Sequence, residues 1–93
     1  MAVKHIRIIP GKRPKVRPSS VRVRVREDQV QWDCNRDFVV CFEEKKPFKD
    51  WHFYRRGHRR SGLPTVRPGR MKYKYTVEVG GHIVDPPDVE IIR

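Results

Sequence analysis

The stretch that decides the fold is MKYKYTVEVGGHIVDPPDVEI, residues Met71–Ile91. Between Tyr73 and Val79 apolar and polar residues alternate, and this period of two predicts a half-buried β-strand. Gly80-Gly81 is a two-residue turn signal, and the strand that follows it covers His82–Val84. This part of the chain is therefore expected to form a β-hairpin.

The two ends of the chain supply further short strands. Asp85–Asp88 breaks the strand after the hairpin, because its two consecutive prolines withhold backbone donors. Val89–Ile92 then predicts a last strand. At the opposite end His5–Ile9 predicts a first strand, which Pro10-Gly11 ends.

The middle of the chain predicts three more strands. In Val21–Arg26 valine alternates with arginine, which places the valines inward and the arginines in solvent. Gln29–Cys34 and Phe38–Phe42 are separated by Asn35–Asp37, which favours a tight turn, so the two runs are expected to pair as a hairpin. In the matching register one face is apolar and consists of Val30, Trp32, Cys34, Phe38, Val40 and Phe42. The other face carries Gln31, Asp33 and Cys41.

Two segments show no such period. Lys12–Ser20 is basic and rich in proline, and residues 12–20 are expected to be an extended loop. Residues 43–69 are expected to form a long loop punctuated by proline and glycine, and a helical turn around Lys49–Arg55 is compatible with its sequence. The whole pattern predicts an all-β protein with one domain over residues 1–93, a small antiparallel Greek-key β-sandwich with one long basic and aromatic loop. Its core is expected to contain Trp32, Val40, Phe42, Tyr75 and Val77.

Positive charge is the strongest compositional feature. The chain has 22 Lys and Arg against 11 Asp and Glu, a net charge of +11 at pH 7. Nine of the basic residues lie in Met1–Arg26, which contains no acid, and nine more lie in Lys49–Lys74, where Asp50 is the only acid. Such a surplus attracts polyanions, so the expected partner is an acidic protein surface or another polyanion, nucleic acid included.

The segment WHFYRRGHRRSG, Trp51–Gly62, combines aromatic residues with arginines, as surfaces that stack bases and neutralise phosphates do. The candidate polyanion-binding residues come from this segment and from the Pro-rich loop: Arg55, Arg56, Arg59, Arg60, Lys12, Arg13, Lys15 and Arg17. The candidate stacking residues are Trp51, Phe53 and Tyr54. The competing interpretation is that these aromatic residues anchor the long loop to the core. No base-reading motif is present, so binding is expected to be unselective.

The layout of two segments resembles that of the cupredoxins, the family of plastocyanin and azurin. The first is PSSVRVRVREDQVQW, with a proline, a Val-x-Val strand, an acidic turn and Val-x-Trp, carried by Pro18, Val23, Val25, Asp28, Val30 and Trp32. Glu27 stands where glycine is usual in that family. The second is PGRMKYKYTVEV, in which a Pro-Gly turn precedes a tyrosine-rich strand, carried by Pro68, Gly69, Tyr73 and Tyr75. The resemblance covers residues 3–92 in layout and implies a cupredoxin-like sandwich.

The copper ligands of that family are missing from this chain. A type I copper site needs two imidazoles and a thiolate, usually with a weak axial methionine. Where the first histidine of the family is expected, this chain has Asn35–Asp37. The loop before the last strand, TVEVGGHIVDPPD, holds His82 but neither Cys nor Met. The resemblance therefore implies a metal-free cupredoxin-like domain without a cofactor.

Other metal sites and catalytic sites find little support in the sequence. Cys34 and Cys41 are spaced too widely for a zinc knuckle completed by His52 and His58. The expected register also puts the two cysteines on opposite faces, which argues against a disulfide. The serines have no neighbouring pattern of histidine and carboxylate, so no enzymatic activity is expected.

Three functions remain open on the sequence. The first is a non-enzymatic interaction module whose basic face docks an acidic protein or polyanion. The second is a non-specific nucleic-acid-binding protein, and the third is a copper or redox protein with atypical ligands. No apolar run approaches the roughly 18 residues of a spanning helix, and the charged start MAVKHIRIIP makes a poor signal peptide. A soluble cytoplasmic protein without a membrane span is therefore expected.

Overall fold

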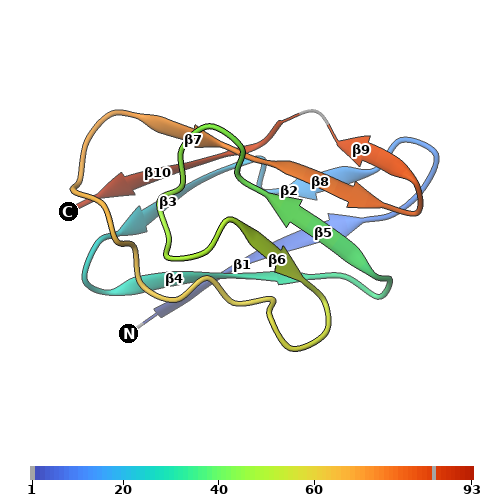
Figure 1. The fold of residues 1–93 in the computed structure, drawn as a ribbon, viewed down its shortest axis with the longest axis horizontal. Coiled ribbons are helices and arrows are strands. Elements are labelled where there is room, and N and C mark those ends of the chain that lie inside the picture. Colours follow the sequence, from blue (N-terminus) through green and yellow to red (C-terminus); the bar gives the residue numbers. More distant parts are fainter. Residues whose placement is uncertain (1, 85) are drawn as a thin grey trace.

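The computed structural model describes residues 2–84 and 86–93, and its regular elements are all strands. They are β1 (Ala2–Ile9), β2 (Lys15–Arg17), β3 (Ser20–Arg24), β4 (Asp28–Asp33), β5 (Phe38–Cys41), β6 (His52–Tyr54), β7 (Lys72–Lys74), β8 (Thr76–Val79), β9 (His82–Val84) and β10 (Asp88–Ile92). The sheets have the orders β2-β1-β4, β3-β10-β7 and β6-β5-β8-β9. In Figure 1 the four-stranded sheet lies in front of β1 and β2, so two layers enclose the core. The all-β sandwich predicted from the sequence is confirmed.

Two strand pairs of the sandwich are parallel. β1 pairs with β4 in the register His5↔Gln31, and β10 pairs with β3 in the register Val89↔Val21. The other pairs are antiparallel, as expected. Alternation of apolar and polar residues is the same in either direction along a strand, so it carries no information about strand direction.

The predicted hairpin of residues 29–42 is wrong. β4 pairs with β1 in one layer, whereas β5 pairs with β6 and β8 in the other layer. The Asn35–Asp37 connection therefore carries the chain from one layer to the other. The predicted inward face is nevertheless right, with Val30, Trp32, Phe38, Val40 and Phe42 buried and Cys34 packed against them. Both strands turn an apolar face to the same core, which is why alternation alone could not separate the two arrangements.

The hairpin predicted in the opening stretch is confirmed, but the single strand predicted over Tyr73–Val79 is interrupted at Tyr75. β7 before this residue pairs with β10, and β8 after it pairs with β5. β8 and β9 pair through Val79↔His82, and the two residues between them, Gly80 and Gly81, have φ of 60° and 78°. Only glycine adopts this left-handed conformation without steric cost, so this sequence fixes a tight two-residue turn. The part of the predicted break that involves Asp85 lies outside the described residues.

Both predicted loops contain a short strand. Within residues 12–20, β2 pairs with β1 and β3 begins at Ser20. Within residues 43–69, a strand, β6, replaces the helical turn around Lys49–Arg55 and pairs with β5. Each of these strands buries one residue, Val16 or Phe53, between two exposed neighbours. An alternation over three residues is too short to distinguish a strand from a loop in the sequence.

Trp32 lies at the centre of the core. It stacks on Phe53 with ring centroids 4.8 Å apart and meets Tyr75 edge to face at 5.7 Å. Phe42 and Phe48 complete the aromatic cluster around it. All five predicted core residues are buried. The long loop therefore contributes Phe48 and Phe53 to the core and is held against it.

Candidate functional site

Basic side chains gather on the outer surface of the sheet β2-β1-β4. Arg7 lies between the buried Ile6 and Ile8, so its side chain points away from the core. Lys15 and Arg17 flank the buried Val16 in the same way, and Arg7 faces Arg17 across the β1–β2 pair. The pairing thus assembles three exposed cations on one surface.

The segment after β6 extends this surface. The chain turns tightly at Gly57, whose φ is 81°, and the Tyr54 N–H donates to the His58 carbonyl at 2.9 Å. Residues 59–61 then run along the free edge of β4. Trp32 N–H donates to the Arg59 carbonyl at 2.9 Å, and Ser61 N–H donates to the carbonyl of residue 30 at 2.7 Å. Together with the bridge Gln31↔Arg60, these bonds place Arg60 on the outer side of the sheet. We call the surface formed by Arg7, Lys15, Arg17 and Arg60 the basic face.

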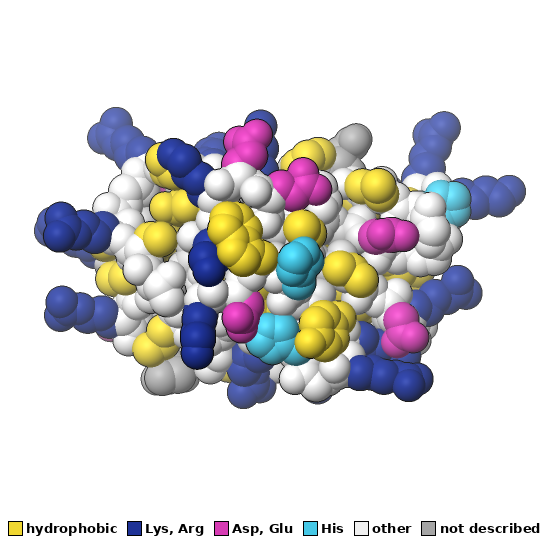
Figure 2. Space-filling model, in the orientation of Figure 1, with side chains coloured by type: hydrophobic (Ala, Val, Ile, Leu, Met, Phe, Trp, Pro, Cys, Tyr) yellow, Lys and Arg dark blue, Asp and Glu magenta, His cyan; other side chains and the backbone are white. Residues whose placement is uncertain are grey.

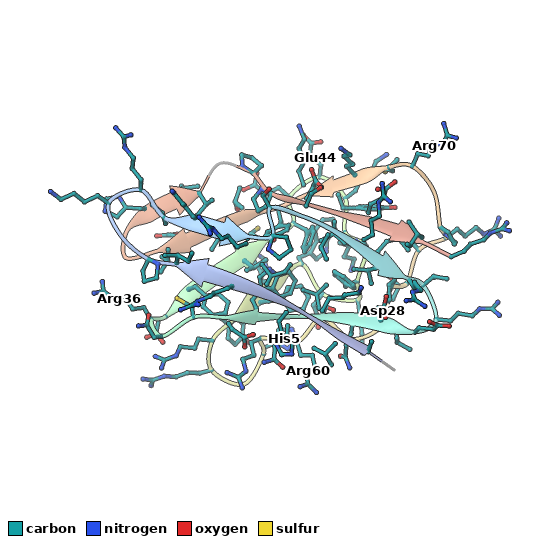
Figure 3. All side chains as sticks on the ribbon, turned by 180° about the vertical axis from the view of Figure 1, so that it is seen from behind. His5, Asp28, Arg36, Glu44, Arg60 and Arg70 are labelled. Carbon is teal, nitrogen blue, oxygen red and sulfur yellow. The ribbon has the colours of Figure 1, made fainter. Side chains whose placement is uncertain are left out.

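A chain of hydrogen bonds orients Arg60. Its Nε and Nη2 donate to Gln31 Oε1 at 3.1 and 2.7 Å, and Gln31 Nε2 donates to Asp33 Oδ1 at 2.7 Å. The other carboxylate oxygen of Asp33 lies 2.7 Å from His5 Nδ1. Figure 3 labels His5, from β1, and Arg60, from the segment along β4, and the strand register places them on either side of Gln31. This chain of contacts buries Gln31 although its side chain belongs to the outer face.

The acid on the basic face is held by this network. Partial burial raises the pKa of Asp33, but hydrogen bonds from Gln31 and His5 and the nearby charge of Arg59 lower it, and the pKa lies below the usual value for an aspartate. The two Asp33 oxygens are thus occupied by Gln31 and His5. Arg7, its register neighbour on β1, is left without an ion pair among the described residues.

The predicted polyanion-binding residues fall into three groups. Lys15 and Arg17 lie on the basic face with Arg60, and Arg59 lies beside Asp33. Lys12 and Arg13 lie exposed in the β1–β2 connection, at the right-hand end of the molecule in Figure 1.

Arg55 and Arg56 belong to the turn after β6. Their guanidinium groups lie 3.6 and 3.8 Å from the same carboxylate oxygen of Asp37. Ion pairs this long and this exposed contribute little to stability. They do, however, place a negative charge between these two arginines, so the turn is less positive than its sequence suggests.

Two of the predicted stacking residues, Phe53 and Tyr54, are unavailable to the basic face. Phe53 is fully buried between Trp32 and the His58 ring, 5.0 Å from the latter, and its ring is unavailable to a ligand. Tyr54 is 47% exposed and points from β6 to the outer side of the other layer, away from the core-facing Phe53. Trp51 is 39% exposed, and Lys46 Nζ lies 5.1 Å from its ring centroid. For Phe53 the anchoring interpretation is therefore the one that holds.

The outer face of β6-β5-β8-β9 has a different character. Tyr54, Val39, Glu78 and Ile83 lie in one cross-strand row, and all four are exposed. Figure 2 shows this side of the molecule, with hydrophobic, acidic and histidine side chains over its middle and Lys and Arg mostly around its rim. The positive charge is therefore unevenly distributed over the surface.

The sequence did not single out Arg7 or the contacts of Arg60. Arg7 occupies a polar position in the predicted first strand, but its relation to Lys15 and Arg17 appears only when residues 15–17 pair with that strand. His5, Gln31 and Arg60 are brought together by two pairings between distant segments. The sequence around each of these residues does not predict their contacts with one another.

The chemistry of the cysteines and histidines is simple in the part of the chain that the structure describes. Cys34 and Cys41 are free and half-buried. Burial raises the pKa of the Cys41 thiol, and the charge of Glu43 raises it further. Over residues 2–84 and 86–93, no three His, Cys, Asp or Glu side chains lie close enough to hold a metal ion. Within the same residues, no helix is long and apolar enough to cross a membrane.

Comparisons with protein-family models, with curated proteins and with solved structures found no match for this chain.

Proposed function

We propose that this protein is a non-enzymatic interaction module whose basic face docks an acidic protein surface or another polyanion. The observation that carries the proposal is the set of unpaired cations on and beside β1 and β2. Lys12, Arg13, Lys15 and Arg17 are exposed together with Arg7, and in the described part of the chain none of them has an ion-pair partner. These like charges repel one another in the free protein, and an anionic partner reduces that repulsion.

The hydrogen-bonded Arg60 adds geometric definition to this face. Two of its nitrogens are already held by Gln31, so less side-chain freedom is lost when a ligand binds. A guanidinium also presents several donors in a plane, which suits carboxylate and phosphate groups.

A single-stranded nucleic acid is the weaker candidate for the partner. Binding of that kind combines phosphate neutralisation with stacking of bases on aromatic rings. Phe53 is buried, and Tyr54 points outward from the opposite layer, so neither ring is available to stack on a base bound at the basic face. A protein carboxylate surface or a sulfated or phosphorylated chain needs no such ring.

The cupredoxin-like assignment is part of the same proposal. Its support is the position of the residues that carry the resemblance: Trp32 and Tyr75 meet at 5.7 Å in the core, and Val30 and Val23 are buried beside them. The proposal that the domain is metal-free rests on the absence of the family's ligand types from the corresponding segments of the sequence.

The proposal is tested by binding to fluorescein-labelled heparin at low salt. The variant Arg7→Gln, Lys15→Gln, Arg17→Gln removes three charges from the basic face. The control Arg70→Gln, Lys72→Gln, Lys74→Gln removes three exposed charges on and beside β7. We expect the first variant to weaken binding about tenfold and the control by much less, because only charges close to the bound chain contribute strongly. Equal losses in the two variants would mean that no particular face binds, and undetectable binding by the wild type would reject heparin-like polyanions.

A further inference from the structure

A groove of about 770 Å³ lies at the end of the molecule opposite the β1–β2 connection. One wall is the turn between β3 and β4, Arg24–Glu27, and the other is the segment Pro64–Pro68. Arg93, beyond the end of β10, lies between the two walls. None of the lining residues belongs to the basic face.

Backbone hydrogen bonds hold both walls in place. Val25 N–H donates to the Ile92 carbonyl at 2.8 Å, and Gly69 N–H donates to the Ile91 carbonyl at 3.0 Å. The two walls are therefore fixed to opposite edges of β10. On the second wall, Thr65 N–H also donates to the Pro47 carbonyl at 2.9 Å. The groove exists before any ligand arrives.

The groove combines apolar side chains with unpaired arginines. Val25 and Val66 are half-buried and pack against the core, and Pro64 and Pro68 continue this apolar lining. Around it, the rim carries three arginines, which are exposed and without ion-pair partners among the described residues: Arg26, Arg67 and Arg93.

The single acid in the groove is already neutralised. Among the side chains of the described lining residues Glu27 carries the only carboxylate, and Arg24 Nη1 lies 2.8 Å from its Oε2. Among the described lining residues, the three rim arginines therefore face the open groove without a competing side-chain carboxylate, and a ligand with carboxylates complements them.

We propose that this groove binds an extended acidic peptide that carries apolar side chains. Its carboxylates would pair with Arg26, Arg67 and Arg93, and an apolar side chain would cover Val25 and Val66. Nucleic acid fits less well, because the lining residues include no aromatic ring on which a base could stack. This site goes beyond the proposed function: it lies on different residues and uses apolar contact in addition to charge.

The groove is tested with two labelled peptides that differ only in apolar content, one alternating Glu with Leu and the other alternating Glu with Ser. Affinity is measured by fluorescence anisotropy at fixed low salt. We expect the Glu-Leu peptide to bind the wild type about tenfold more tightly, because leucine loses apolar surface to the groove. Equal affinities would overturn the groove in favour of a simple charge effect.

Charge-matched variants then locate the site. Arg26→Gln, Arg67→Gln, Arg93→Gln should weaken binding of the Glu-Leu peptide about tenfold. The variant Arg7→Gln, Lys15→Gln, Arg17→Gln should change it by less than about threefold. Amide chemical shifts in the wild type should move at residues 24–27 and 64–68 when this peptide is added. Shifts confined to other segments, or equal weakening by both variants, would overturn the proposal.

Failure of this inference is distinguishable from failure of the proposed function. Heparin binding reports on the basic face and should survive substitution of Arg26, Arg67 and Arg93. If heparin fails to bind while the Glu-Leu peptide binds in the groove, the groove stands without the basic face. The opposite pattern rejects the groove alone.

Discussion

Trp32 is the residue on which most of the core depends. It is fully buried and contacts Phe42, which follows β5, Phe48 and Phe53 from the long loop, and Tyr75 between β7 and β8. In a domain of 93 residues the buried surface is limited, so one large aromatic ring accounts for much of it.

Trp32→Ala should destabilise the protein by about 3–5 kcal/mol, because it removes a large buried ring and leaves a cavity. The matched control is Trp51→Ala, which removes a 39% exposed ring and the contact with Lys46. Its cost should be about 1 kcal/mol or less. Urea denaturation followed by circular dichroism measures both. Similar losses for the two tryptophans would contradict the central role of Trp32.

The carboxylate of Asp33 predicts a pH dependence of stability. Its pKa lies below the usual aspartate value of 3.8, so the folded protein favours the ionised form more than the unfolded chain does. Its contribution to stability is therefore present above pH 3.8 and is lost as the pH falls through the lower, folded-state pKa. The melting temperature of Asp33→Asn should decrease less on acidification below pH 3.8 than that of the wild type. If the melting temperatures of the two proteins decreased equally across this range, His5 and Gln31 would not stabilise the charge of Asp33.

Among the strands, the sequence predicted which residues face the core much better than which strands are neighbours. Val30, Trp32, Val40 and Val77 are buried as alternation required. The pairing of residues 29–42 failed because two adjacent strands with inward apolar faces fit a hairpin and a crossing between layers equally well. Which strands pair depends on contacts between segments that are distant in the sequence, and the alternation within one strand does not specify those contacts.

For the candidate site too, the sequence predicted some of the residues but not how they are arranged in space. Lys15 and Arg17 were predicted because they lie in a basic segment, and such a segment is recognised from residues that are neighbours in the sequence. The basic face and the orientation of Arg60 depend on the pairs Arg7↔Arg17 and Gln31↔Arg60, and neither pair follows from the residues near it in sequence. The groove near Arg93 was missed for the same reason, since its two walls are about 40 residues apart in the chain.

The β8–β9 hairpin permits a direct test of its turn. Gly81 has a φ of 78°, a conformation that costs an L-residue about 1–2 kcal/mol. Gly81→Ala should therefore lower stability by about that amount, although a Cβ there would meet no neighbouring atom within 4 Å. Gly69→Ala is the control, because that site is equally open and its φ lies outside the left-handed region. It should be neutral or slightly stabilising. Equal effects in thermal melts would mean that backbone conformation at Gly81 does not limit the hairpin.

The distribution of charge over the protein follows from its two layers. The outward positions of β1 and β2 include Arg7, Lys15 and Arg17, whereas the row of outward positions across β6-β5-β8-β9 carries Tyr54, Val39, Glu78 and Ile83. The molecule measures 36 × 23 × 19 Å, so opposite ends are separated by several Debye lengths at physiological salt. Two anionic ligands at the β1–β2 connection and at the groove near Arg93 would therefore bind almost independently.

The salt dependence of polyanion binding is the broadest consequence of this arrangement. Each phosphate neutralised releases bound cations, so if about six basic side chains engage duplex DNA, log affinity should change with log salt with a slope near −5. Replacing Lys12, Arg13, Lys15 and Arg17 with glutamine should reduce the steepness of that slope by about 3–4, because these cations have no ion-pair partner in the described chain. Replacing Arg55, Arg56, Arg59 and Arg60 removes the same charge but should reduce the steepness of the slope by only about 2, since Arg55 and Arg56 already share Asp37.

Unrelated DNA sequences should compete equally, because the basic face offers no arrangement that reads bases. Fluorescence titrations at four or more salt concentrations measure all three slopes. A larger change in the second variant would move the binding face to the turn after β6, and three equal slopes would show that neither set of residues contacts the DNA.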